Sequence, residues 1–336
     1  MTAALAAIQE TEARIAESLA GAPVLALSQL GGGRNSRVFR VETATACYAL
    51  KLYPPAGDGR DRFGVETTVL RWMEAQAFAM VPRLIAADHR RGAALLSWED
   101  GELVSAPVAA DVSQACDFLR RLHEHRFTPA LPFSHLAAEA CLSGAEVERQ
   151  VRGRLSALLA LRDDALTEFL QREAEPELAP RSLRARANWA DSFDSDLPQA
   201  GRSQVPSDFG FHNALRREGG QLTFIDFEYF GWDDPAKLIG DLLLHPGTAL
   251  NDDLRVGIFE TAYGIYADQK FSARLAALLP LLGLRWALIL LNEFFPERWR
   301  RRAAAGLPGS WEETKERQLA AARIMLTRHI IPGVTT

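Results

Sequence analysis

Three polar side chains in the second half of the chain have the types and spacing needed to hold a divalent cation. Asp208 and Asn213 are five residues apart, and Asp226 follows thirteen residues after Asn213, at the end of an apolar run. A carboxylate at the end of a buried strand is costly unless a metal ion or hydrogen-bond donors satisfy it. Mg²⁺ prefers oxygen ligands and usually binds through few carboxylates together with substrate phosphates. The spacing therefore predicts oxygen ligands for a divalent cation, and one of the two carboxylates could instead face a substrate hydroxyl.

An Asp, four intervening residues, an Asn and a later strand-borne Asp form the pattern of a kinase catalytic loop. The transferred phosphoryl group carries dispersed negative charge, so a cation must neutralise it and another group must aim the acceptor hydroxyl. We therefore predict ATP and Mg²⁺ as cofactors, Asn213 and Asp226 as the metal ligands, and in-line transfer to the hydroxyl of a small molecule. Asp208 is the predicted catalytic residue that orients this hydroxyl and takes its proton late.

The first hundred residues contain groups that should accompany such a loop. Lys51 lies on a predicted strand, and Glu66 lies fifteen residues later on a predicted helix. In kinases, a strand lysine paired with a helix glutamate is held against the nucleotide phosphates, so both are predicted catalytic residues. Backbone N–H groups of a glycine-rich turn can approach phosphates. The predicted nucleotide-binding residues of this turn are Gly32, Gly33, Arg34, Asn35 and Ser36.

Each of these residues has an ordinary structural interpretation when it is taken alone. The glycine run would then be a hairpin turn, Lys51 a solvent-facing strand residue and Asp208 a turn cap. His212 is tempting as a base, but packing within the loop is the favoured interpretation. The order and number of the groups together favour the kinase interpretation over these alternatives.

Hydrophobic and turn patterns predict the elements that must position these groups. A composition shift near residue 100 separates a sheet-rich part from a helical part. We therefore predict an α+β, bilobal protein-kinase-like fold with an antiparallel-sheet N-lobe, residues 1–101, and a mainly helical C-lobe, residues 102–336. The predicted helices cover 2–20, 60–76, 110–124, 147–161, 164–173 and segments from 235 onward; the predicted strands are three within 24–53, then 82–88, 93–98 and 222–227; residues 174–205 are predicted as a loop or weak helix.

Composition bounds the remaining possibilities. The 336 residues carry a net charge of −5 and three cysteines without metal or disulfide spacing. A mildly acidic chain is a poor general binder of nucleic acid. The apolar stretch Leu275–Leu291 is broken by Pro280 and Arg285, which favours a buried helix pair over a membrane span. We find no targeting segment and expect a cytoplasmic protein without a membrane partner; the pattern leaves the oligomeric state open.

Several segments resemble landmarks of the aminoglycoside phosphotransferase and choline kinase-like superfamily, over roughly residues 25–300. They are Ala49-Leu50-Lys51, Glu66, Ser97–Gly101, Leu122-His123, Asp208…Asn213, Ile225–Glu228 and Asp234-Pro235…Asp241. The resemblance implies a bilobal kinase-like fold and a small-molecule kinase. It further implies nucleotide contacts at Ser97, Trp98 and Glu99, and a bracing role for Asp241 beneath the catalytic loop.

The chain departs from that family before its catalytic Asp. The family usually has His-Gly there, whereas this chain has Pro206-Ser207. The histidine normally supports the loop, so another group must do so here. This departure motivates the alternative of a pseudokinase that acts as a nucleotide-binding or scaffolding module. A protein kinase is disfavoured because only seven residues separate Asp226 from Asp234, too few for an activation segment.

The acceptor stays undetermined at this point. Glu228, Asp233 and Glu293 could form an acidic cleft for a cationic amino alcohol or amino sugar. Arg285 or Asn292 could instead hydrogen-bond the hydroxyls of a neutral sugar.

Overall fold

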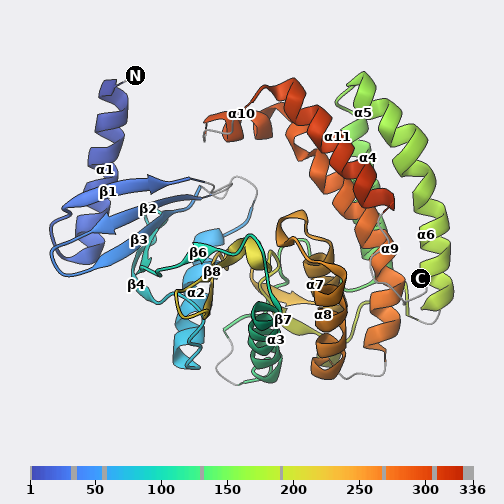
Figure 1. The fold of residues 1–336 in the computed structure, drawn as a ribbon, viewed down its shortest axis with the longest axis horizontal. Coiled ribbons are helices and arrows are strands. Elements are labelled where there is room, and N and C mark those ends of the chain that lie inside the picture. Colours follow the sequence, from blue (N-terminus) through green and yellow to red (C-terminus); the bar gives the residue numbers. More distant parts are fainter. Residues whose placement is uncertain are drawn as a thin grey trace. The chain divides into compact units, whose positions relative to one another are not determined.

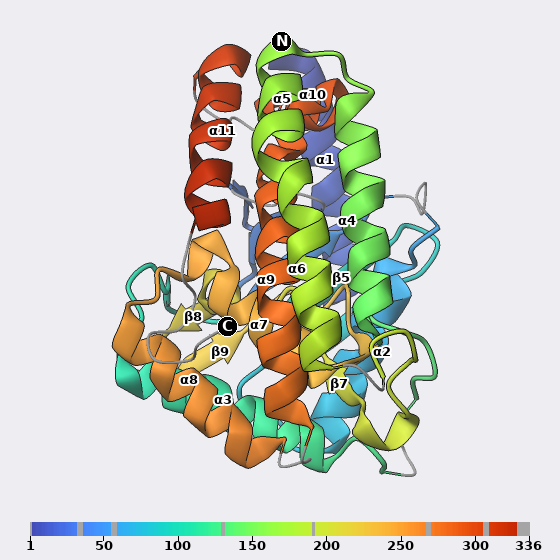
Figure 2. The same cartoon turned by 90° about the vertical axis from the view of Figure 1, so that its right-hand side faces the viewer.

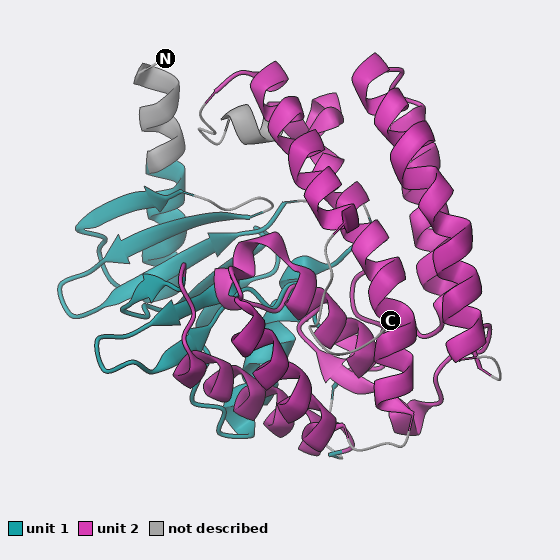
Figure 3. Cartoon of the chain, turned by 45° about the vertical axis from the view of Figure 1, so that its right-hand side comes forward, with its two compact units in different colours: residues 1–104, 128–132, 213–230 teal, residues 105–127, 133–212, 231–336 magenta. Residues whose placement is uncertain are grey.

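The computed structural model describes residues 2–31, 36–54, 59–128, 132–189, 192–266, 270–304 and 309–327. The chain forms two compact units (Figure 3). The first unit contains residues 1–104, 128–132 and 213–230, and the second contains 105–127, 133–212 and 231–336. The first unit is discontinuous because a strand after residue 101 hydrogen-bonds to a hairpin that lies far along the chain. The two domains predicted from the sequence, 1–101 and 102–336, were each continuous, and that division stays a prediction.

A five-stranded antiparallel sheet forms the body of the first unit (Figure 1). Its strands are β1 (Ala26–Leu30), β2 (Arg37–Glu42), β3 (Cys47–Leu52), β4 (Leu84–Asp88) and β5 (Ala93–Ser97), in the order β1-β2-β3-β5-β4. The three strands predicted within residues 24–53 are β1, β2 and β3, and they pair antiparallel as expected. The predicted antiparallel sheet of the N-terminal part is thereby confirmed.

The two faces of this sheet have different roles. Alternate side chains of a strand point to opposite faces. Leu50 and Leu52 of β3 belong to an apolar cluster with Phe39 and with Ala16 of helix α1 (Thr2–Ala20). Lys51 lies between those leucines and therefore faces the other side, toward helix α2 (Arg62–Ala75). The apolar face thus anchors the strand that carries the lysine.

A smaller sheet completes the first unit. It contains β6 (Glu102–Leu103), β8 (Ala214–Arg216) and β9 (Leu222–Phe224), in the order β6-β8-β9. The strand predicted over 222–227 ends at Phe224. Asp226 has φ of +69°, and this left-handed conformation is incompatible with the extended backbone of a strand. Asp226 therefore lies just beyond the strand, not at its last position.

The second unit is mainly helical, and its central helix is α9 (Phe271–Leu290), with α4, α6 and α11 alongside it (Figure 2). Its other helices are α3 (Ala109–Glu124), α4 (Gly144–Leu159), α5 (Asp164–Phe169), a π-helical turn (Leu170–Ala174), α6 (Glu175–Asn188), α7 (Pro235–Leu244), α8 (Asp252–Ile265), α10 (Pro296–Ala304) and α11 (Trp311–Thr327). Short 3₁₀ turns cover Gln199–Gly201, Phe211–Asn213, Pro246–Thr248 and Leu291–Phe294. Strands β7 (Ser203–Val205) and β10 (Gly231–Asp233) pair antiparallel. The predicted helical character of this part is confirmed.

Two sequence predictions in this unit need correction, and both concern prolines. The stretch expected as a helix pair around Pro280 is the single helix α9. Within 174–205, which was expected to be a loop or weak helix, α6 is a regular helix of 14 residues with Pro180 inside it. A proline inside a helix removes one hydrogen bond and crowds the preceding turn. The two helices pack against each other, and this burial outweighs the local penalty.

One segment of the described chain, Phe271–Phe294, is long and apolar enough to cross a membrane. Of its most apolar window, 72% is buried inside the protein. Because its apolar surface is covered by the neighbouring helices, the segment is accounted for as the core helix of this unit.

Arg181 joins helix α6 to two neighbouring helices. Arg181 donates to the carbonyl of Pro280 at 2.8 Å and to that of Leu326 at 2.9 Å, and it pairs with Glu177. Its side chain is only 15% exposed. Arg181 therefore ties α6 to the carbonyls of α9 and α11, including one that belongs to the proline itself.

We expect Arg181→Met to lower the free energy of unfolding by about 2 kcal/mol, because two carbonyls lose a charged donor. Denaturant unfolding would measure the loss. Arg184→Met, on the exposed surface of the same helix, is the matched control and should change stability far less. Equal effects of the two substitutions would contradict the tying role of Arg181.

Candidate functional site

A buried ammonium group is the centre of the candidate site in the first unit. Lys51 Nζ lies 2.6 Å from Glu66 Oε2, 2.6 Å from Asp226 Oδ1 and 3.2 Å from Glu228 Oε2. The Lys51 and Glu66 side chains are almost fully buried, whereas that of Asp226 is 36% exposed. The site therefore combines buried supports with one carboxylate that a ligand can reach.

The charges of this cluster depend on one another. Burial alone would lower the pKa of Lys51, but the carboxylates of Asp226 and Glu66 outweigh it and raise the pKa well above its usual value. Burial raises the pKa of Glu66, and Lys51 opposes this rise. Burial and the neighbouring Glu66 raise the pKa of Tyr53. Lys51 thus stays protonated, as an electrostatic contact with phosphates requires.

Several neighbours hold Glu66 and Glu228 in position. Tyr53 donates its hydroxyl to Glu66 Oε2 at 2.8 Å, and the Phe227 amide donates to Glu66 Oε1 at 3.2 Å. Ser36 donates its hydroxyl to Glu228 Oε2 at 2.8 Å. The pair of Lys51 and Glu66 was expected from the sequence, but Tyr53 and Glu228 were missed as partners of this cluster. The spacing could have indicated both partners. Tyr53 is two residues from Lys51 and so takes the same face of the strand, and Glu228 follows Asp226 by two residues.

The predicted nucleotide-binding residues fall into three groups. Gly32, Gly33, Arg34 and Asn35 lie outside the described residues. Ser36 is buried, with its hydroxyl bonded to Glu228. Ser97, Trp98 and Glu99 lie at and just after the end of β5, and their side chains are engaged locally.

Those local bonds limit what the segment after β5 can offer a nucleotide. Ser97 donates to Glu99 Oε1 at 2.6 Å, Glu99 also pairs with Arg217, and Trp98 donates to Asp100 at 2.9 Å. The guanidinium of Arg40 lies over the indole of Trp98, 5.1 Å from its centroid. The polar groups of these side chains are already bonded to one another. A nucleotide bound at this segment would therefore hydrogen-bond to the backbone more readily than to the side chains.

The two predicted metal ligands lie close together, one on either side of the β8–β9 hairpin. Ala214 pairs with Phe224, and the Ile225 amide donates to the Asn213 carbonyl at 2.9 Å. Asp226 is the next residue. The carboxylates of Glu66, Asp226 and Glu228 also place one oxygen each within 4.8 Å of one another. Lys51 Nζ already pairs with all three of these carboxylates, so Asp226, which is partly exposed, is the one that a hard cation such as Mg²⁺ could reach.

One carboxylate oxygen of the cluster around Lys51 can accept a further hydrogen bond or bind a cation. Glu228 Oε1 is buried and accepts no hydrogen bond from the described residues, although the guanidinium of Arg62 lies 3.5 Å away. A buried carboxylate oxygen in this state can accept a further donor or a cation. The donor chemistry of the cluster is thus compatible with a metal ion.

Asp208 belongs to the second unit and sits on a tight turn. Its amide donates to the Pro206 carbonyl at 2.9 Å, and Ser207 between them has φ of +66°. Such a conformation is unusual for a residue other than glycine. Ser207 donates its hydroxyl to the Ala138 carbonyl at 2.8 Å, which anchors the strained backbone. The turn thus presents Asp208 with its side chain 42% exposed.

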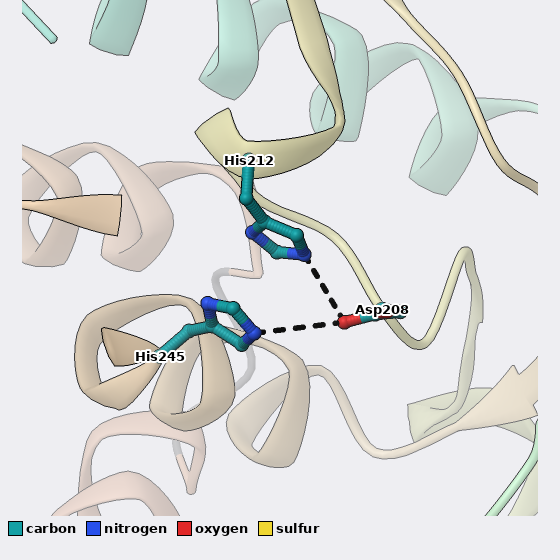
Figure 4. Close-up of side chains that lie close together, drawn as sticks. All are labelled: Asp208, His212 and His245. Atoms are coloured by element: carbon teal, nitrogen blue, oxygen red, sulfur yellow. Dashed lines mark hydrogen bonds and ion pairs between the residues drawn. The ribbon is translucent and has the colours of Figure 1, made fainter. Parts of the chain in front are cut away.

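Two histidines converge on the carboxylate of Asp208 (Figure 4). His212 Nε2 lies 3.2 Å and His245 Nε2 lies 3.9 Å from Asp208 Oδ1. His212 was expected to pack within the loop, and His245 was not anticipated from the sequence. His245 is 33 residues beyond His212 and is brought there by the turn after α7, so no local pattern indicated it.

Asp241 is linked to the loop through a chain of intervening side chains. It accepts hydrogen bonds from Trp286 Nε1 at 2.8 Å and from Lys237 Nζ at 2.9 Å. The Trp286 ring in turn meets His245 edge to face at 4.8 Å. Support from Asp241 can therefore reach the loop through Trp286 and His245.

The acidic cleft expected for a cationic acceptor is not formed by Glu228, Asp233 and Glu293. Glu228 is buried beside Lys51 and Arg62. Asp233 is fully buried, lies 3.1 Å from Lys237 and accepts the amide of Cys141. Glu293 is buried as well. Glu228 and Asp233 are paired with Lys51 and Lys237, as buried carboxylates require, and none of the three side chains lines an open cleft.

The fold is shared with solved kinases of small molecules. The choline kinase LicA from Streptococcus pneumoniae superposes with a TM-score of 0.59 at 15% identity, covering 95% of this chain and 98% of that one. The APH(2")-IIa complex with gentamicin gives 0.59 at 16% identity, with 94% and 96% covered. A choline/ethanolamine kinase family protein from Mesorhizobium loti gives 0.57 at 17% identity, with 90% and 88% covered.

Sequence comparison adds the family. No curated protein matches the chain in sequence. The profile of the phosphotransferase enzyme family (APH) matches residues 26–273, which include both the Lys51 cluster and the Asp208 loop. With this match over most of its length and a kinase-like fold, the chain belongs to the phosphotransferase enzyme family.

Proposed function

We propose that the protein transfers the γ-phosphate of ATP to a hydroxyl group of a small molecule. The observation that carries this proposal is the position of Lys51, whose ammonium joins Glu66 and Asp226 at 2.6 Å each. A buried lysine bridging a helix glutamate and a partly exposed aspartate is suited to holding phosphates next to a metal site. Membership of the phosphotransferase enzyme family supports the same reaction class.

Each group of the first unit has a role in this proposal. Lys51 binds the nucleotide phosphates, and Glu66 orients Lys51. Asn213 and Asp226 would hold Mg²⁺, which neutralises charge on the phosphates when it is bound. The turn around Ser36 and the backbone of Ser97–Glu99 would contact the nucleotide. Structures with this fold include a ternary complex with streptomycin and ATP and an ADP-bound phosphotransferase, which supports ATP as the donor.

Asp208 in the second unit would handle the acceptor. An exposed carboxylate can accept a hydrogen bond from the acceptor hydroxyl and aim its oxygen at the γ-phosphorus. It would take the proton late, because the loose transition state of phosphoryl transfer demands orientation more than a strong base. In the transfer, the bond between the acceptor oxygen and the γ-phosphorus forms, the bond from the γ-phosphorus to the bridging oxygen breaks, and ADP leaves.

For the acceptor we propose an amino alcohol, an amino sugar or a sugar. The names of the similar structures mention choline, ethanolamine and gentamicin, which are the first compounds to assay. A hexose panel covers neutral acceptors, for which Asn292 is the candidate contact. Arg285, the other residue considered for this role, is buried and bonded to Gln150, Glu139 and Asp241, so it is not available to an acceptor. Cytoplasmic location stays a prediction.

We expect ATP with Mg²⁺ to raise the melting temperature of the protein more than ATP with EDTA does. Ligand at about 100 times its Kd adds about 2.7 kcal/mol to the stability of the folded state. Asp226→Ala should retain a rise with ATP but lose the additional rise with Mg²⁺. Thermal-shift titrations measure these differences, each against the unliganded melting temperature of the same variant.

Asp253→Ala, at an exposed position of α8, is the control and should behave as the unmodified protein does. A rise that is indifferent to Mg²⁺ would favour the pseudokinase alternative. The absence of any rise with ATP or GTP would contradict nucleotide binding at the Lys51 cluster.

We expect Asp208→Asn to lower turnover by about 10²- to 10⁴-fold, the usual contribution of a positioned proton acceptor. Nucleotide affinity should be unchanged, because Asp208 has no role in binding ATP in this proposal. Coupled ADP release with the acceptor panel measures turnover, and the thermal shift measures binding. Full turnover in this variant would remove Asp208 from the mechanism, and Asp253→Asn is the control.

A further inference from the structure

We propose that His212 and His245 are positioning residues that together orient the carboxylate of Asp208, His212 through a hydrogen bond from its Nε2–H and His245 through a longer electrostatic contact from its own Nε2–H. The inference rests on the proposed role of Asp208 and adds the groups that orient it. Both Nε2 atoms face the same oxygen, at 3.2 Å and 3.9 Å (Figure 4). Ser207, which directly precedes Asp208, does not take this role, because it donates its hydroxyl to the Ala138 carbonyl.

The hydrogen-bond chemistry assigns the proton of His245. Its Nδ1 accepts the Gly247 amide at 3.0 Å, so Nδ1 carries no hydrogen. A neutral imidazole has one N–H, which must then be on Nε2. His245 therefore turns its donor toward Asp208.

The same assignment follows for His212. An ionised carboxylate can only accept, so the 3.2 Å contact requires a hydrogen on His212 Nε2. His212 Nδ1 is buried and has no hydrogen-bond partner among the described residues. A hydrogen there would be a buried donor without an acceptor, which is costly.

The donor assignment also disfavours a metal ion at the three groups. One atom from each of Asp208, His212 and His245 lies within 4.8 Å of the others, as in a metal site. A metal would need the lone pair of His245 Nε2, and the proton would then move to Nδ1, where it would oppose the Gly247 amide. The ring is oriented by a donor, whereas metal-bound histidines donate from their other nitrogen.

Two glycines provide the space that the rings occupy. A Cβ atom at Gly210 would lie 2.8 Å from His212 Nδ1 and 2.9 Å from Thr248 Cγ2. A Cβ atom at Gly247 would lie 3.1 Å from His245 Cε1 and 3.2 Å from His212 Cβ. Side chains at these positions would displace the rings from Asp208. The glycines and the histidines therefore form one packing arrangement.

The arrangement is braced by buried groups behind the rings. The two imidazoles stack at 3.8 Å with 12° between their planes, and the Trp286 ring meets His245 edge-on. Trp286 is held by its hydrogen bond to Asp241, which is itself paired with Lys237. The stacked imidazoles are fixed by Trp286 on one side and can therefore orient the Asp208 carboxylate on the other.

Leucine and glutamine substitutions at each histidine test the positioning role. Leu removes the donor, whereas Gln can return an N–H close to the place of Nε2. With ATP, Mg²⁺ and the best acceptor of the panel, we expect His212→Leu and His245→Leu to lower kcat about 10- to 100-fold. The KM for ATP and the melting temperature should change little, and the Gln variants should recover part of kcat.

His123→Leu is the matched control, since this half-buried imidazole of α3 lies against Tyr266 and Ser203. It should leave kcat close to that of the unmodified protein. The positioning role would be overturned if the Leu variants lost stability and ATP affinity in step with kcat, or if Gln and Leu variants were equally impaired at both sites.

A second measurement is independent of the acceptor. Long-range ¹H–¹⁵N spectra of the seven histidines report which ring nitrogen carries hydrogen. We expect the Nε2–H form for His212 and His245, and both Nε2 resonances should move in Asp208→Ala while that of His123 does not. An Nδ1–H form at either residue, or Zn²⁺ binding that is lost in all three single Ala variants, would overturn the donor assignment. If no compound of the panel is phosphorylated, the proposed function fails, and these spectra still decide whether the two rings hold Asp208.

Discussion

The ammonium group of Lys51, buried among three carboxylates, is the interaction on which the first unit depends. Each of these charges would be strongly destabilising if it were buried alone, and removing one partner of a buried pair typically costs about 3–5 kcal/mol. The charges come from β3, from α2 and from the segment after β9, which are far apart in the chain. Their mutual neutralisation therefore couples these three elements. It also explains how Asp226 can adopt a left-handed backbone, since the ion pair with Lys51 stabilises that position.

In the second unit, the exposed carboxylate of Asp208 is supported by buried side chains. The Asp208 side chain is 42% exposed, as its proposed contact with an acceptor requires. Its supports are layered behind it: the two imidazoles, then Trp286, then the ion pair of Asp241 with Lys237. A long acidic side chain at the surface would be harder to orient in this way, because ordering it costs more rotamer entropy. A short carboxylate held by rigid rings has few alternative positions.

Local patterns predicted most elements and failed where tertiary packing opposed a local rule. The antiparallel strands, α2 and α3 follow from alternation and helical spacing. Helix α6 was not expected as a regular helix because Pro180 and its charged neighbours oppose one on local grounds. Its packing on α9 and the bonds of Arg181 outweigh that penalty. The strand predicted before Asp226 was too long, because the left-handed backbone of a single residue produces no periodic pattern in the sequence.

The sequence by itself determined the residue types, their order and the reaction class they suit: a strand lysine, a helix glutamate, an Asp-x₄-Asn loop and a later aspartate. These depend on spacing along one chain, which a sequence displays directly. Only the tertiary structure decided which groups meet. It showed that Lys51 contacts Glu228 as well as Glu66, that Asp233 is paired with Lys237 in the core, and that His245 reaches Asp208. Alternation tells which face a side chain takes, but its partner on that face depends on how distant elements pack. The contact between His245 and Asp208 in particular arises from the packing of the whole unit, and no local pattern in either residue indicates it.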